Sequence, residues 1–288
     1  MDSQCTFFLC VYVQVTKKLA GAAAGTAAWA TNVGNEHGQI LISVLTAAEG
    51  AGLADMATGL VNRYLAAGQP PPQVLYVDRD CCTVSTRRLF QPWQDLVIRL
   101  DIWHFMRRFA SCCTTDSHQL HGLFVSKLSS CIFQWDSEDI AALRRAKSAE
   151  LLAMGVSGLS EADLLRRLSR RELALHCRRT TRGVEETTTL LQELITAFDS
   201  DRGKDSLGVP LLDHDRIQVM WDQQRKHVSC IQDPPGVSLY TRTGSLKKGG
   251  VDLPTYRCAR GSTSLESFHR HMAQFIPGNA TVGRCFMT

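Results

Sequence analysis

Two aspartates stand at the ends of short apolar runs, and this arrangement is the clearest sign of chemistry in the chain. The runs are Val74-Leu75-Tyr76-Val77-Asp78 and Leu96-Val97-Ile98-Arg99-Leu100-Asp101. Their length and their aliphatic content predict buried parallel strands. Ligands of open α/β sheets bind beyond the carboxyl ends of such strands. Asp78 and Asp101 are therefore placed to converge on one hard cation, which prefers carboxylate oxygens.

Each aspartate also has a purely structural interpretation. Asp78 would open a turn, and Asp101 would cap a helix over residues 102–109, because aspartate readily accepts hydrogen bonds from the first N–H groups of a helix. Asp80 follows Asp78 by two residues, so in an extended chain it points to the same side and is a further candidate ligand. The sequence leaves these alternatives open.

A histidine and a third carboxylate extend the pattern. His104 follows Asp101 by three residues, and Glu266 stands in the stretch Thr263-Ser264-Leu265-Glu266-Ser267-Phe268-His269. His104 is spaced either to orient a phosphate or to bond to Asp101 across the first helical turn. Glu266 also fits a capping box, in which a glutamate bonds back to the N-cap residue. The chemical and structural interpretations both stay open.

The order of these motifs resembles that of the DDE transposases, whose catalytic domain has the RNase H-like fold of retroviral integrases. The Asp-x-x-His element at Asp101 looks like that of Mutator-like and hAT-like elements, and the stretch around Glu266 is similar to transposon-derived proteins of animal genomes. The resemblance covers roughly residues 15–135 and 220–285. It implies an RNase H-like mixed sheet with flanking helices, interrupted by a mainly helical insertion.

The resemblance also implies a metal site. Asp78, Asp101 and Glu266 would hold two Mg²⁺ or Mn²⁺ ions, with His104 beside them. A first aspartate is expected on the strand that precedes residues 15–19. Residues 10–13 (Cys-Val-Tyr-Val) occupy that region, and the only carboxylate before Glu36 is Asp2.

Removal of one acid weakens such a site, because the repulsion among crowded carboxylates is what favours the cations. We therefore expect impaired catalysis. The chain would be a decayed or co-opted copy, or its start would replace the original upstream sequence.

The predicted elements follow one another in the order of an α/β core. An apolar run before residue 14 predicts a first strand, and residues 39–46 predict another after a Gly/Asn turn. Apolar residues at three- and four-residue spacing predict an amphipathic helix over residues 47–67, which ends at Gly68. Residues 21–31 fit either a strand or a loop, and a strand there would form a hairpin with residues 39–46. Trp103 and Phe105 are expected in the core. Residues 136–139 are expected to begin a helix that continues to residue 154, and residues 244–250 are expected to form a loop. We expect three regions: an RNase H-like core over 1–135, a helical insertion over 136–254, and a final core helix with Glu266 over 255–288, truncated at its C-terminus.

The predicted insertion carries a concentration of positive charge. Residues 164–182 contain seven arginines and one acid, Glu172, which gives a local charge of 7 − 1 = +6, against +4 for the whole chain. If this segment is one helix, one face carries Arg167, Arg171, Arg178 and Arg182. Such a stripe would bind DNA phosphates without reading sequence. The alternative is a solvated surface paired with acids such as Glu185 and Glu186.

Composition sets the outer limits. The 288 residues are 44% hydrophobic and 21% charged, as expected for one large or two ordinary globular domains. The apolar run at the start is too short to span a bilayer and follows no Lys or Arg, so neither a membrane partner nor secretion is expected. The eleven cysteines contain no Cys-x-x-Cys pair, which favours reduced thiols in an intracellular protein, nuclear or cytoplasmic.

These observations lead to three functional hypotheses. The first is a transposon-derived, catalytically impaired DDE transposase-like protein that keeps nonspecific affinity for DNA. The second is an active Mg²⁺-dependent nuclease or transposase, with its site completed by Asp80 or by an acid not yet identified. The third is a non-enzymatic interaction scaffold. A homo-oligomer is compatible with each hypothesis.

Overall fold

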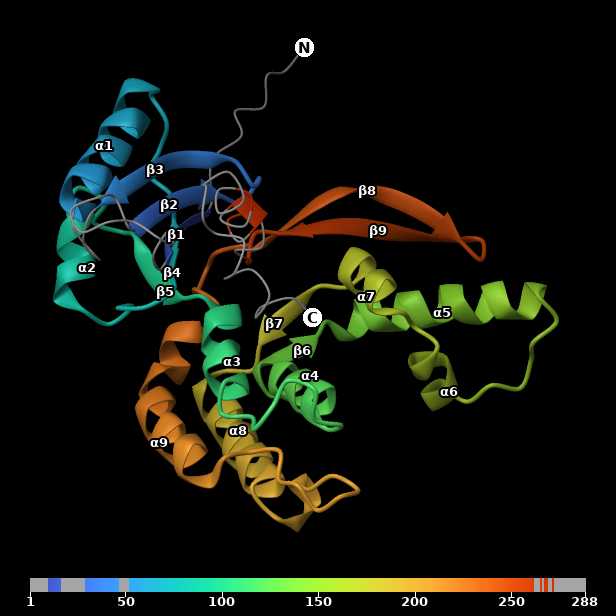
Figure 1. Ribbon diagram of the computed structural model, residues 1–288. Helices are drawn as coiled ribbons and strands as arrows, with labels where there is room; N and C mark the ends of the chain where they lie inside the picture. Colours follow the sequence, from blue (N-terminus) through green and yellow to red (C-terminus); the bar gives the residue numbers. More distant parts are fainter. Residues whose placement is uncertain are drawn as a thin grey trace. The chain divides into compact units, whose positions relative to one another are not determined.

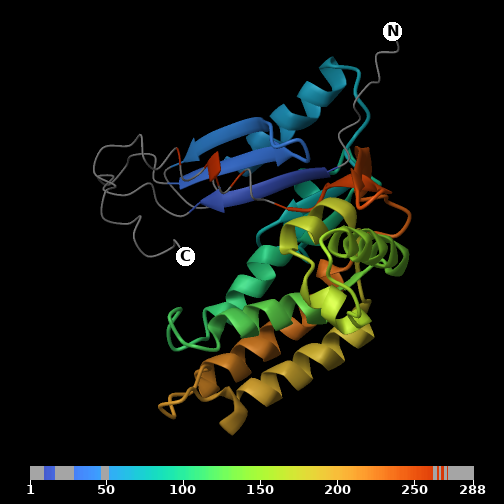
Figure 2. The same ribbon diagram turned by 90° about the vertical axis from the view of Figure 1, so that its right-hand side faces the viewer.

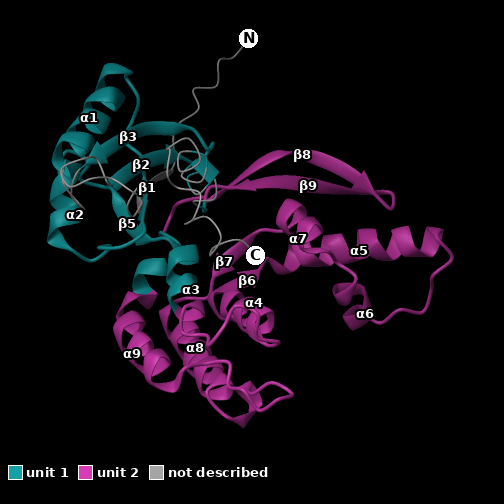
Figure 3. Cartoon of the chain, viewed as in Figure 1, with its two compact units in different colours: residues 1–108, 229–234, 260–288 teal, residues 109–228, 235–259 magenta. Residues whose placement is uncertain are grey.

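The computed structural model describes residues 10–16, 29–46 and 52–261, together with residues 265, 267, 268 and 271. The described chain is a mixed α/β protein, and this part of the predicted fold class is confirmed. It divides into two compact units (Figure 3). Unit 1 comprises residues 1–108, 229–234 and 260–288, and unit 2 comprises residues 109–228 and 235–259. No helix within the described ranges combines the length and the apolar character needed to cross a membrane.

Unit 1 is built on a five-stranded sheet in the order β3-β2-β1-β4-β5 (Figure 1). β2 is antiparallel to both β1 and β3, whereas β4 is parallel to both β1 and β5. The strands are β1 (Cys10–Thr16), β2 (Trp29–Asn35), β3 (Ile40–Thr46), β4 (Val74–Val77) and β5 (Val97–Leu100). The predicted hairpin and the two predicted strands before Asp78 and Asp101 are therefore present, and β2 overlaps the segment that the sequence left undecided.

The helix α1 (Leu53–Ala66) supplies one side of the unit 1 core. It buries five side chains at helical spacing, Met56, Ala57, Leu60, Val61 and Tyr64. These pack in one cluster with sheet residues and with Trp93, which lies after α2 (Val84–Leu89). The helix ends where the sequence predicted, because Gly68 has a left-handed φ of 61° that favours glycine.

The helix α3 (Ile102–Ala110) begins immediately after β5. Phe105 and Phe109 are fully buried, as expected for core residues four positions apart on one helix face. Trp103 was expected in the core as well, and this expectation is wrong. It is 46% exposed, because its position lies on the opposite side of the helix, where Arg107 covers its ring at 5.1 Å from the ring centroid.

Unit 2 contains a helical layer formed by α4 (His121–Ile132), α8 (Val184–Phe198) and α9 (His214–Gln224). Figure 2 shows these helices alongside one another. Their buried residues include Leu128, Leu191 and Ile217, and the rings of Phe124 and Phe198 pack edge to face. Two short strands, β6 (Phe133–Trp135) and β7 (Arg179–Thr181), pair beside this layer.

A second core in unit 2 lies around α5 (Ser137–Ala153), the helix predicted after Trp135. Its side chains are Leu143, Ala146, Leu168, Cys177 and Leu253. The elements that contribute to it or flank it are α6 (Glu161–Arg166), α7 (Arg170–His176), β8 (Tyr240–Lys248) and β9 (Val251–Cys258). Asp136, Ser160 and Ser169 cap the three helices with side-chain hydrogen bonds to backbone N–H groups.

Residues 244–250 were expected to form a loop, and the structure corrects this prediction. They belong to the β8–β9 hairpin, whose turn is Gly249-Gly250 with φ values of 54° and 79°. Two consecutive residues with positive φ define the tight turn that suits the twist of a hairpin. The glycine pair was therefore the signal for a hairpin in the sequence. Short 3₁₀ segments, η1 (Asp201–Gly203) and η2 (Arg225–Ile231), complete the described elements.

Candidate metal sites and charged surfaces

The two aspartates lie at neighbouring strand ends. Val77 on β4 pairs with Leu100 on β5, and the backbone N–H of Asp101 donates to the Val77 carbonyl oxygen at 2.8 Å. Asp78 and Asp101 are the next residues on these parallel strands. Adjacent strands lie about 4.8 Å apart, so the two backbones present their acids at one edge of the sheet.

Asp101 is also the helix cap that the structural interpretation predicted. Its Oδ1 atom accepts hydrogen bonds from the backbone N–H of His104 and lies 3.0 Å from the His104 Nδ1 atom. The residue is only 5% exposed. Capping and the bond to His104 hold the carboxylate in one orientation at the strand end, which is compatible with a ligand role as well as with a structural one.

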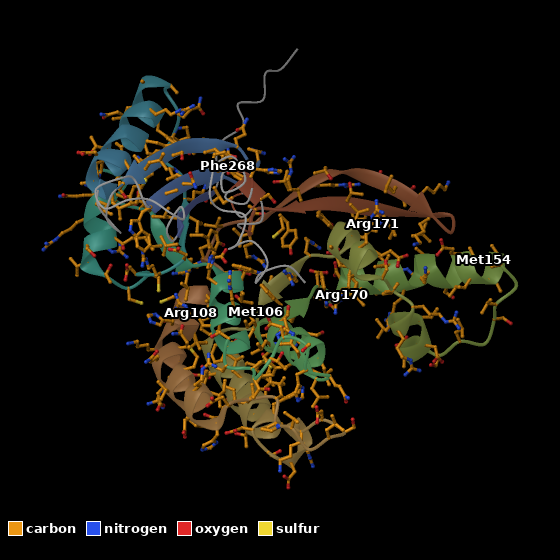
Figure 4. All side chains as sticks on the ribbon, viewed as in Figure 1. Met106, Arg108, Met154, Arg170, Arg171 and Phe268 are labelled. Atoms are coloured by element: carbon orange, nitrogen blue, oxygen red, sulfur yellow. The ribbon has the colours of Figure 1, made fainter. Side chains whose placement is uncertain are left out.

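Asp78 is partly buried at the end of β4. Its carbonyl oxygen accepts a 2.7 Å hydrogen bond from the guanidinium of Arg108, which extends from α3 (Figure 4). A guanidinium at this edge adds positive charge beside the two acids. A guanidinium is also a group that binds phosphate oxygens.

Asp80 does not extend the strand as the sequence argument assumed. It has a left-handed φ of 59°, and its side chain is 62% exposed. Its carbonyl oxygen accepts from the Thr83 backbone N–H at 3.2 Å and from the hydroxyls of Thr83 and Thr86, both at 3.0 Å. The chain therefore turns directly after Asp78, and the premise that Asp80 points the same way is wrong.

The pairing of β1 with β4 shows which residue of β1 is next to the acids. Val13 pairs with Val77, so the residues that follow, Gln14 and Asp78, are neighbours at the ends of the two strands. Sequence reasoning looked for the first acid at residues 10–13 and passed over Gln14, because only strand pairing defines the neighbour. On its other side Gln14 pairs with Asn32 of β2.

Asn32 is a polar residue in the middle of the sheet. It is fully buried, and neither atom of its amide has a hydrogen-bond partner among the described residues. An unsatisfied buried amide costs about 1–3 kcal/mol. Asn32, Gln14 and the strand-end acids thus occupy consecutive register positions across β2, β1, β4 and β5.

Glu266 lies outside the described residues, so its predicted role stays a prediction. The neighbouring Leu265 is fully buried. A Cβ atom added to Gly34 of β2 would lie 2.9 Å from its side chain. Leu265 therefore packs closely against β2, which places the residue before Glu266 at the sheet of unit 1.

The expected arginine stripe is not formed, because the segment is not one helix. α6 ends at Arg166, Ser169 caps a new helix, and residues 179–181 form β7. Ser169 and Glu172 form a capping box, with the Ser169 hydroxyl accepting from the Glu172 N–H. This local hydrogen bonding begins a second helix where the sequence argument continued the first. Arg167, Arg171, Arg178 and Arg182 therefore share no helical face.

Two of the four arginines are engaged within unit 2. Arg178 donates to the buried carboxylate of Asp139 from its backbone N–H, Nε and Nη2 at 2.9, 2.8 and 3.1 Å. The hydrogen bonds to Asp139 raise the pKa of Arg178 above its usual range. Arg182 pairs with Glu186 at 2.6 Å. The acid-paired alternative thus holds for Arg178 and Arg182, although Arg178 uses a different acid from the one proposed.

The other two arginines are exposed. Arg167 and Arg171 make no direct ion pair within the part of the chain that the structure describes, and neither does Arg170. Arg170 and Arg171 are consecutive residues in the first turn of α7 (Figure 4). Within residues 164–182, the exposed arginines without a direct ion pair are therefore these three, which we call the α7 arginines.

Lys248 belongs to a second ionic cluster. Its ammonium contacts Glu172 and Glu150, and Lys147 lies 3.2 Å and 3.0 Å from the same two carboxylates. Burial by itself would raise the pKa of Glu172, but hydrogen bonds from Lys248, Ser169 and Lys147 together lower it to about 2. This cluster fastens the β8–β9 hairpin to α5 and α7.

A group of sulfur and nitrogen ligands lies close to the β4–α2 turn. Cys81, Cys82, His227 and Cys230 offer four ligand atoms that all lie within 4.8 Å of one another. The Cys81 and Cys82 sulfurs are 3.6 Å apart, and those of Cys82 and Cys230 are 2.9 Å apart. The sulfur of Cys230, with burial as a second cause, raises the pKa of Cys81 above its usual range. This cluster could hold a metal ion, but it is not a carboxylate triad.

The sequence analysis did not predict this cluster. Its two halves are 148 residues apart, and neither contains a Cys-x-x-Cys pair. The adjacent Cys81-Cys82 and the His227-x-x-Cys230 spacing were the available signals.

The chain matches no protein-family model and no curated protein. The sheet of unit 1 and the residues at its edge are therefore the features that bear on the class of this protein.

Proposed function

We propose that this chain is a transposon-derived protein with an RNase H-like core, related to the DDE transposases, and that its acidic site is incomplete. The observation that carries the proposal is the sheet of unit 1. An antiparallel hairpin is followed by two parallel strands that end at Asp78 and Asp101. This supports the order of elements that the resemblance implied.

The strand register supports an incomplete acidic site. A third acid on β1 beside Asp78 would stand at Gln14, and an uncharged amide is a weak ligand for a hard cation. Mg²⁺ or Mn²⁺ held by Asp78, Asp101 and Glu266 would activate the attacking oxygen and stabilise the leaving oxygen of a phosphodiester. His104 keeps Asp101 oriented, and Arg108 adds positive charge at the edge that a phosphate would approach.

DNA is the partner that best fits the positive charge of the α7 arginines. The α7 arginines (Arg167, Arg170 and Arg171) are exposed and lie close together in sequence on either side of the Ser169 cap. Guanidinium groups of this kind bind phosphates without reading bases. Such a protein would act where DNA is present, in the nucleus or the cytoplasm.

The test is cleavage of a generic DNA duplex in Mg²⁺ or Mn²⁺. We expect the natural chain to be inactive and Gln14→Asp to gain activity, because the new carboxylate would stand beside Asp78. In the Gln14→Asp background, Asp78→Asn, Asp101→Asn or Glu266→Gln should each abolish cleavage. Asp95→Asn, which changes an exposed acid away from the strand ends, should not.

Other outcomes separate the alternatives. Cleavage by the natural chain that is lost in all three acid variants would mean that the site is complete and the protein is an active nuclease. If Gln14→Asp stays inactive and the natural chain binds no DNA at low salt, both the enzymatic and the DNA-binding hypotheses fail. An interaction scaffold would then remain.

A further inference from the structure

The cysteine and histidine cluster has the composition of a metal site that differs from the acidic one. Thiolate and imidazole are the ligands that Zn²⁺ selects, whereas Mg²⁺ selects carboxylates. Four ligands at Zn²⁺ distances of 2.0–2.3 Å stand about 3.3–3.8 Å from one another in a tetrahedron. The 3.6 Å separation of the Cys81 and Cys82 sulfurs falls in this range, and all four ligand atoms lie within 4.8 Å.

The first half of the cluster lies on a well-defined turn. Cys81 and Cys82 follow Asp80, whose left-handed backbone reverses the chain after β4. Three hydrogen bonds to the Asp80 carbonyl oxygen, from Thr83 and Thr86, close the turn around the two cysteines. Thr83 also caps α2 by accepting from the Thr86 N–H. The two thiols are thus positioned by backbone structure that does not depend on a metal.

The second half lies on η2, which carries His227 and Cys230 three residues apart in one continuous segment. In a 3₁₀ helix, residues three apart stand on the same side. The segment is anchored next to Cys230, because the guanidinium of Arg99 on β5 donates to the Gln232 carbonyl oxygen at 2.8 Å. Cys230 is buried, as the inner ligand of a structural site would be.

We propose that Cys81, Cys82, His227 and Cys230 bind one structural Zn²⁺ ion. With four protein ligands the ion keeps no open position for substrate, so its role is to hold structure. It would tie η2 to the turn that begins directly after Asp78. This inference goes beyond the proposed function and holds whether or not the acidic site is active.

The first measurement is the metal content of the chain purified without chelator. We expect one zinc per chain by mass spectrometry of the metal. Stripping the ion should lower the melting temperature, and added Zn²⁺ should restore it, because a ligand that binds only the folded state stabilises it. Reconstitution with Co²⁺ should give the intense visible absorption of a tetrahedral thiolate site.

The variants assign the ligands. Cys82→Ser and Cys230→Ser should lose stoichiometric zinc, whereas Cys258→Ser, at a partly exposed cysteine of β9, should keep it. His227→Ala should lose zinc and His227→Cys should retain it, since a fourth thiolate replaces the imidazole. The His227 pair keeps the test valid even if a cysteine variant fails to fold.

Three results would overturn the proposal. One is a natural chain without bound zinc that shows no stabilisation when Zn²⁺ is added. Another is zinc that persists in every cluster variant, which would locate the metal elsewhere. The third is an intact mass lower by two hydrogens with a peptide linking Cys82 to Cys230. That result would identify a disulfide, which the 2.9 Å separation of these sulfurs makes the natural competitor.

Discussion

The two units differ in the groups that contact their buried and partly buried carboxylates. In unit 2, Asp139 faces the guanidinium of Arg178, and Glu172 faces the ammonium groups of Lys147 and Lys248. In unit 1, Asp101 is as deeply buried as Asp139, yet it bonds to a backbone N–H and an imidazole. A carboxylate paired with a guanidinium or ammonium group is compensated by a full opposite charge, whereas a backbone N–H supplies only a dipole. The comparison indicates a structural role for the acids of unit 2 and is compatible with the ligand role proposed for Asp101 in unit 1.

The largest expected effect tests the structural role in unit 2. Asp139→Ala should lower the free energy of unfolding by about 2–4 kcal/mol, because it leaves the guanidinium and backbone N–H of Arg178 without their acceptor. Urea denaturation measures this change. Asp222→Ala removes an exposed acid that lies 3.9 Å from Arg225, and it should change stability by less than about 0.5 kcal/mol. Equal effects of the two substitutions would contradict the comparison.

The next test is the pH dependence of the free energy of unfolding, to which Glu172 contributes. Its pKa in the folded protein, about 2, lies below the ordinary value of 4.5, so its stabilising contribution is complete above that ordinary value and is lost as the pH falls toward 2. Glu172→Gln should cost about 1–3 kcal/mol at neutral pH and should flatten the stability curve between these pH values. The measurement is urea denaturation across that pH range. An unchanged slope in the variant would show that other groups carry the acid dependence.

A third prediction concerns the buried amide of Asn32 in unit 1, which has no hydrogen-bond partner among the described residues. Asn32→Leu should stabilise the apo protein by about 1 kcal/mol, because it replaces an unpartnered amide with an apolar group of similar size. Asn35 is the matched control, since its amide oxygen accepts from the N–H groups of His37 and Gln39. Asn35→Leu should destabilise the protein by about 1–2 kcal/mol. If thermal denaturation finds both variants destabilised alike, Asn32 has a partner.

The smallest expected effect concerns the α7 arginines. Arg167→Ala together with Arg171→Ala should leave folding unchanged and should reduce the slope of log binding constant against log salt by about 2, one for each lost phosphate contact. Fluorescence anisotropy with a generic duplex measures this slope. Arg225→Ala, at a site weakly paired with Asp222, is the control. A slope unaffected by the double substitution would remove these residues from the proposed DNA surface.

The sequence by itself determined the elements whose signals are local. The strands before Asp78 and Asp101, the helix that ends at Gly68 and the helix that follows Asp136 all form where periodicity and capping predicted them. The Asp101 cap and its bond to His104 were foreseen for the same reason, since they span one helical turn. Spacing within three or four residues is fixed by helix and strand geometry, so a single segment contains the information.

The tertiary structure decided everything that depends on pairing between distant segments. Gln14 became the neighbour of Asp78 through strand register, and Arg178 became structural through Asp139, which lies 39 residues away. Cys82 and Cys230 came together across 148 residues. Such contacts follow from how the core packs and from which backbone groups find partners, and neither is encoded in local spacing. The resemblance predicted the acids of the site, but the residue beside Asp78, Gln14, is defined by the strand pairing of the folded chain.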